Sequence, residues 1–217
     1  MEKKQSVEEQ SLFSSESKLT KGLESLYRLF ILNVLFIVLS LPIVTIGIAQ
    51  MSLYDSIKQL KESPDNRPLA VFVQSVKTHW RQGLKIGLLE IFITFIVWLD
   101  MMVINTQIGV SSFVLKAFFY GMSLIIVMTI FYLIPLSLRR KKTNLLTLFK
   151  ESFLIACIHL PWSLGLMFLS MVLLHLFQLN VLMTMALLSL FMVLGFSCVT
   201  YIQSMVIEPL LNKELNV

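Results

Sequence analysis

Long apolar runs separated by short polar stretches dominate the chain and predict membrane-spanning helices. A helix needs about 20 apolar residues to cross a hydrocarbon core of about 30 Å. Five runs reach this length, near residues 29–48, 86–105, 113–138, 152–177 and 181–207. Because helices satisfy their own backbone hydrogen bonds in lipid, we expect an all-α fold, a polytopic helical membrane bundle of about five transmembrane helices.

Two shorter stretches, 49–62 and 69–83, have the mixed pattern of amphipathic helices. In the second stretch, apolar side chains recur at the three-and-four spacing of one helical face: Leu69, Phe72, Val73, Val76 and Trp80. This pattern is typical of a helix that lies in the headgroup plane. The chain is thus expected to have a polar N-terminal tail (1–25), a single transmembrane domain (26–211) and a C-terminal tail (212–217).

The first run carries residues that favour a helix break. Pro42 and Gly47 disfavour a continuous helix, and Thr45 is a suitable N-cap for a helix that restarts just after it. The run therefore has two alternatives: it crosses the membrane once, or it turns back near residues 41–47. The second alternative requires protein or water around the polar residues of the return segment, which are Gln50, Asp55 and Lys58.

Composition supports a membrane protein and excludes an ordinary soluble enzyme. Of the 217 residues, 56% are hydrophobic and 14% are charged, whereas soluble domains are about 25% charged. The net charge of +5 arises from 18 Lys and Arg against 13 Asp and Glu. Since the basic residues flank the apolar runs, we assign them to lipid headgroups and expect no nucleic-acid partner.

The distribution of basic residues predicts the orientation of the chain. Residues 49–85 carry six Lys or Arg and residues 139–150 carry five, whereas the connections 106–112 and 178–180 carry none. Because cytoplasmic loops are enriched in Lys and Arg, we expect the two basic loops and the C-terminus to be cytoplasmic. The N-terminus lies outside if the first run crosses the membrane and inside if it turns back.

Several motifs resemble one family. Residues 39–47 read Leu-Ser-Leu-Pro-Ile-Val-Thr-Ile-Gly, and the aromatic and basic stretch 72–87 leads into the second run. Weaker motifs are Phe-Tyr-Leu-Ile-Pro-Leu at 131–136 and His-Leu-Pro at 159–161. Together they resemble the YesL-type family of small bacterial membrane proteins, over roughly residues 25–210. The chain departs from the family at Ile48, where the family often has proline.

The resemblance implies a context rather than a reaction, because the family has no established biochemical activity. Such proteins are commonly encoded beside ATP-driven carbohydrate uptake systems. The resemblance thus implies an accessory or assembly subunit of a carbohydrate ABC-type importer in the bacterial cytoplasmic membrane, with permease subunits as partners. The alternative is an independent small-solute transporter or channel with a cavity lined by Asn33, Glu90, Asp100 and His159. We find no enzyme signature and expect no catalytic residue, no cofactor and no metal site.

Four ionisable residues within the runs are candidate functional residues, because charge in lipid is costly. Asp100 and Lys116 flank a short connection between neighbouring helices, so we expect them to form an ion pair. Glu90 and His159 both lie on outward-running spans and face one another in one interpretation. In the other, Glu90 extends to the cytoplasmic interface and His159 bonds a carbonyl freed by Pro161.

The densest charge run comprises Arg139, Arg140, Lys141 and Lys142. One interpretation is a topology anchor on anionic lipid. The other is a docking patch for a cytoplasmic or membrane partner.

Overall fold

The computed structural model describes residues 2–105, 110–140, 144–158, 161, 165 and 181–214. Every regular element in these residues is a helix, which confirms the all-α prediction. The elements are α1 (Glu2–Ser40), η1 (Ile43–Thr45), α2 (Ile46–Glu62), α3 (Pro68–Asn105), α4 (Val110–Arg139), α5 (Leu145–Ile158), α7 (Val181–Leu190), η2 (Phe191–Gly195) and α8 (Phe196–Glu214).

Four segments of the described residues are long and apolar enough to cross a membrane. They are Gly22–Ser40, Pro68–Leu99, Gly121–Arg139 and Leu188–Asn212. The chain is therefore a multi-pass membrane protein. Most of the predicted fourth run, 152–177, lies outside the described residues, and α5 covers its beginning.

The first apolar run is broken into two helices at the place that Pro42 and Gly47 indicate. α1 ends at Ser40, a turn and the short η1 follow, and α2 begins at Ile46. Thr45 immediately precedes α2, but its hydroxyl makes no cap bond. It donates instead toward backbone carbonyls behind it, 2.7 Å from that of Pro42. This bond holds the turn and leaves the first N–H groups of α2 without a side-chain cap.

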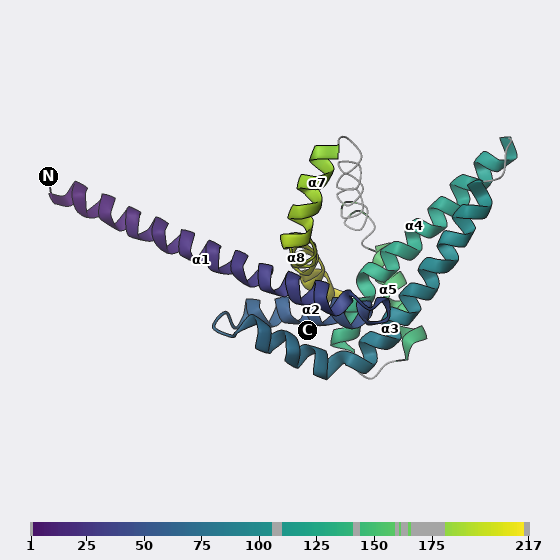
Figure 1. The fold of residues 1–217 in the computed structure, drawn as a ribbon, viewed down its shortest axis with the longest axis horizontal. Coiled ribbons are helices and arrows are strands. Elements are labelled where there is room, and N and C mark those ends of the chain that lie inside the picture. The colour runs from purple at the N-terminus through teal and green to yellow at the C-terminus, as the bar shows by residue number, and fades with distance from the viewer. Residues whose placement is uncertain are drawn as a thin grey trace.

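The stretch 69–83 and the second apolar run form one continuous helix, α3. Its first part runs back along α2 after the turn at 63–67 (Figure 1). Trp80 on this part remains exposed, as a lipid-facing residue would be, whereas Ser75 and His79 are buried. The side of the stretch that packs against the protein is therefore partly polar, because α2 supplies partners for these side chains.

Three glycines allow α2 and α3 to cross with their backbones in contact. A Cβ added to Gly87 would lie 2.8 Å from the backbone nitrogen of Gly47, and one added to Gly83 would lie 2.8 Å from Cα of Ile48. A Cβ on Gly47 would overlap the backbone of Gly87. Only glycine fits at such a crossing, so the beginning of α2 is fixed on α3.

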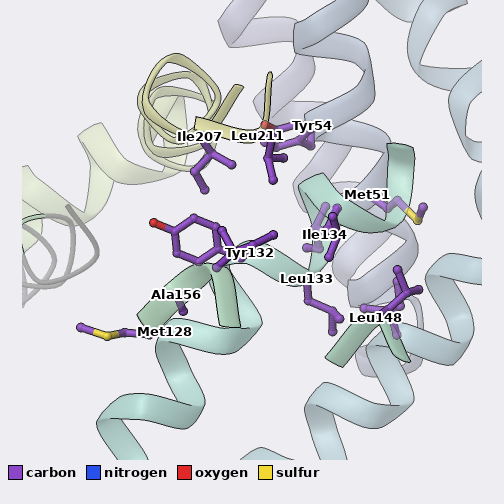
Figure 2. Packing of buried hydrophobic residues seen from close by; sticks show 13 residues of the cluster. Met51, Tyr54, Met128, Tyr132, Leu133, Ile134, Leu148, Ala156, Ile207 and Leu211 are labelled. Carbon is purple, nitrogen blue, oxygen red and sulfur yellow. The ribbon is translucent and has the colours of Figure 1, made fainter. Parts of the chain in front are cut away.

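The largest apolar core lies where α4 meets α2, α5 and α8. Figure 2 shows Tyr132 and Leu133 of α4 at its centre, with Tyr54 of α2 and Leu211 of α8 above and Leu148 of α5 below. All five side chains are almost completely buried. A second core joins α1, α2 and the start of α3. From this packed base, the α3–α4 pair and α7 extend in different directions (Figure 1).

A proline inside α4 is matched by a glutamine on α8. Pro135 lacks an N–H, so the carbonyl of Phe131, four residues earlier, loses its helical donor. The side-chain amide of Gln203 donates to that carbonyl at 2.7 Å. The freed backbone group is thereby satisfied, and α4 is joined to α8 within an apolar environment.

Candidate functional site

A cavity of about 400 Å³ lies among α1, α2, α3, α4 and α8, and Glu90 is on its wall. Much of the lining is apolar, including the aromatic rings of Phe36, Phe131 and Phe196. The polar groups come from several helices, with Gln50 on α2, Glu90 on α3 and others on α8. An apolar cavity with a few convergent polar groups is typical of a small-molecule site.

Two hydrogen-bond acceptors at this cavity have no partner. Glu90 is only 7% exposed, and its Oε1 is buried without a hydrogen bond. The Oε1 atom of Gln50 is in the same situation. Buried polar atoms in folded proteins are nearly always hydrogen-bonded, so an unpaired pair of acceptors at one cavity requires an explanation.

Glu208 of α8 contacts side chains of two other helices, α2 and α4. It forms an ion pair with Arg139 at the end of α4 and lies 3.5 Å from the ammonium of Lys58 on α2. The Tyr54 hydroxyl donates to the same carboxylate at 3.3 Å. Burial raises the pKa of Tyr54 well above its usual range, and the nearby negative charge of Glu208 adds to this effect. The tyrosine therefore acts as a permanent donor.

A second polar cluster, centred on Asp55, holds α2 on α3. Its Oδ2 accepts hydrogen bonds from Ser75 at 2.7 Å and Gln59 at 2.8 Å, and the Nε2 atom of His79 is 3.4 Å away. Burial opposes ionisation of this carboxyl, but the hydrogen bonds from His79, Ser75 and Gln59 lower the pKa of Asp55 below its usual value. Protein thus supplies partners to two of the three polar residues of the return segment, Asp55 and Lys58, whereas Oε1 of Gln50 has none.

Asn33 joins α1 to the π-helical turn η2. Its side-chain amide donates to the carbonyl of Met192 at 2.6 Å, and its Oδ1 accepts from the backbone N–H of Ser197 at 3.1 Å. A π-turn disturbs the regular backbone ladder, and Asn33 satisfies one acceptor and one donor there. The described lining of the Glu90 cavity does not include Asn33.

Three of the predicted intramembrane residues have side chains outside the described part of the chain. Asp100 is near the end of α3 and Lys116 near the start of α4, and these helices lie side by side (Figure 1). Two predictions therefore stay untested: the Asp100–Lys116 ion pair, and the interpretation in which Glu90 and His159 face one another. Of the four ionisable residues predicted within the runs, Glu90 is the one whose side chain the structure describes.

The two arginines of the charge run have internal partners. Arg139 pairs with Glu208 and also donates to Asn212 at 2.6 Å, and Arg140 pairs with Glu151 at 2.6 Å. Lys141 and Lys142 lie outside the described residues. The arginines thus contribute to helix packing, whatever role the run has toward lipid or a partner.

Sequence reasoning missed Glu208 and the Asp55–His79 contact as organising features. Glu208 lies one residue beyond the fifth apolar run, beside Pro209, and so was not among the ionisable residues within the runs. A useful signal was the presence of Arg139 at the matching end of another run. Nothing in the spacing of Asp55 and His79 indicates their contact, because the turn at 63–67 and the helix crossing decide it.

The described residues contain no group of three or more His, Cys, Asp or Glu that could hold a metal ion. Three carboxylates inside the helix bundle lie in different surroundings. That of Asp55 accepts hydrogen bonds, that of Glu208 is ion-paired, and that of Glu90 has an oxygen without a partner. Of these, the arrangement at Glu90 has free capacity to bind a ligand.

Comparison with known proteins gives a single finding. Residues 29–101 match a protein family described as "Protein of unknown function, DUF624". The matched stretch includes the break after α1, the glycine crossing and Glu90. No curated protein and no solved structure matches the chain.

Proposed function

We propose that this chain is a non-enzymatic accessory or assembly subunit of a carbohydrate ABC-type uptake system in the bacterial cytoplasmic membrane. The proposal starts from the resemblance to the YesL-type family, whose two most informative motifs, 39–47 and 72–87, fall within the matched stretch 29–101. The match itself indicates no activity. Its residues coincide with the two motifs on which the resemblance depends.

The observation that carries the proposal is the contact between these two motifs. Gly47 of the first packs directly on Gly83 and Gly87 of the second. In the described structure, the motifs thus build a tight helix crossing, and Ser75 and His79 of the second motif are engaged with Asp55 of α2. Motif residues used in this way favour a role in assembly over a role in catalysis.

The helices beyond the base offer large apolar faces to a partner. Phe92, Phe95, Trp98 and Met102 are exposed along the outer part of α3, and Trp98 is 57% exposed. Because α3–α4 and α7 diverge from the base (Figure 1), the faces of each can be covered by lipid or by helices of a permease. Association by helix packing in lipid requires this kind of accessible surface.

Purification from native membranes tests the proposal. The full-length tagged protein, extracted in mild detergent, should recover permease subunits of a carbohydrate importer. Trp98→Ala should reduce their recovery, whereas Trp80→Ala should not, because Trp80 is similarly exposed at 47% but lies on the base. Recovery of the tagged protein without permease subunits would contradict the proposal.

The second candidate, an independent small-solute transporter or channel, is favoured by the cavity at Glu90. Reconstitution of the purified protein alone in liposomes distinguishes the two functions. Uptake of solute without other subunits would support transport by this chain, and turnover of a lipid or glycan would point to an enzyme instead.

A further inference from the structure

We propose that the cavity beside Glu90 is a binding site for a small organic ammonium ion. The first argument is that this cavity holds buried acceptors that no donor reaches. Oε1 of Glu90 and Oε1 of Gln50 are both buried acceptors without partners. A ligand that satisfies them has to bring donors, and a primary ammonium group brings three.

Three polar side chains around the cavity donate to other groups. The Gln203 amide donates to the carbonyl of Phe131, and the Thr200 hydroxyl donates to that of Phe196. The Tyr54 hydroxyl donates to Glu208. The donors of these three side chains thus point to acceptors other than Glu90 and Gln50.

The second argument is charge. Among the described residues that line the cavity, Glu90 is the one with a formal charge, and no Lys or Arg is present. The nearby cations Lys58 and Arg139 are engaged with Glu208. A buried carboxylate without a counter-ion is strongly disfavoured, and a cationic ligand would supply the missing counter-ion.

The remaining wall suits an organic cation better than a hydrated metal ion. Phe36, Phe131 and Phe196 contribute aromatic surface, and aliphatic side chains such as Val199 complete the lining. Aromatic faces attract ammonium groups, and apolar walls accept an alkyl body. The volume of about 400 Å³ falls in the range of about 300–1,000 Å³ typical of small-molecule sites.

The test compares two probes of equal length, n-hexylammonium and n-hexanol. The full-length protein is placed in nanodiscs of zwitterionic lipid, and binding is measured by titration calorimetry and by the shift in melting temperature. Wild-type protein should bind hexylammonium more tightly than hexanol. Glu90→Gln, which retains the shape of the side chain, should weaken hexylammonium binding by about thirtyfold or more and leave hexanol binding unchanged.

Glu62→Gln is the matched control, because Glu62 is an exposed carboxylate at the end of α2. It should bind both probes as the wild type does. Equal binding of hexylammonium by wild type and Glu90→Gln would overturn the proposal, as would hexanol binding as tight as that of hexylammonium. Should Glu90→Gln not yield monodisperse protein, the comparison of the two probes on the wild type decides the question. The proposal concerns binding and does not depend on the importer partnership.

Discussion

At the scale of single residues, the same side-chain type meets different requirements in this protein. The carboxylate of partly buried Asp55 is surrounded by three donors, whereas Glu90 is buried with an oxygen that has no donor. Glu208 shares its charge with Arg139 and Lys58. The three carboxylates thus differ in the partners that neighbouring helices supply. Asp55 and Glu208 hold helices together, whereas Glu90 remains available to a ligand.

The Asp55 cluster predicts a pH dependence of stability. A carboxyl whose folded pKa lies below its unfolded value stabilises the fold above the unfolded pKa, and this stabilisation is lost as pH falls through the folded pKa. Asp55→Asn should therefore reduce the free energy of unfolding by about 1–3 kcal/mol at neutral pH. Below about pH 4, the difference from the wild type should shrink.

Thermal unfolding in detergent between acidic and neutral pH measures this difference. Asp65→Asn is the control, since Asp65 is exposed in the turn after α2 and should have little effect at any pH. A gap between wild type and Asp55→Asn that stays constant down to the lowest pH would show that the carboxylate is not the stabilising form.

At the scale of the elements, helix contacts in this protein depend on backbone irregularities. The proline in α4, the π-turn η2 and the break after α1 each interrupt a regular ladder. Gln203, Asn33 and Thr45 make hydrogen bonds at these places. Because lipid offers no hydrogen bonds, such interruptions persist where protein groups satisfy the backbone.

The glycine crossing gives a prediction at this scale. Gly87→Ala places a methyl group against the backbone of Gly47 and should destabilise the protein by about 1–3 kcal/mol. Gly121→Ala on α4 meets no atom within 4 Å, so it should be neutral or stabilising by up to about 1 kcal/mol. Melting temperatures of the two variants in one detergent provide the comparison. Equal melting temperatures would mean that α2 and α3 separate without cost.

At the scale of the whole molecule, the break in the first run bears on the path of the chain through the membrane. α2 returns along α1 and α3, and its polar residues Asp55 and Lys58 have protein partners. The requirement for protein around the return segment is thus met at Asp55 and Lys58. We therefore expect the N-terminus on the same side as the basic loops, which also places nearly all Lys and Arg on one side.

Cysteine labelling in intact cells tests this topology. With Cys157 and Cys198 replaced by alanine, Ser11→Cys should react with an impermeant maleimide after permeabilisation only. Gln107→Cys, in the connection without basic residues, should react without permeabilisation. Labelling of Ser11→Cys from outside intact cells would show that the first run crosses the membrane once and that the N-terminus is external.

The sequence by itself determined the fold class, because long uncharged runs have no stable arrangement in water and only helices satisfy their backbone in lipid. It also indicated the break at Pro42–Gly47, since proline and glycine act locally. Only the tertiary structure decided that Gly47 meets Gly83 and Gly87, that Asp55 bonds Ser75, and that Glu90 lines a cavity with an unpaired oxygen. These contacts depend on helix rotation and crossing, which apolar runs specify poorly because lipid accepts almost any apolar face.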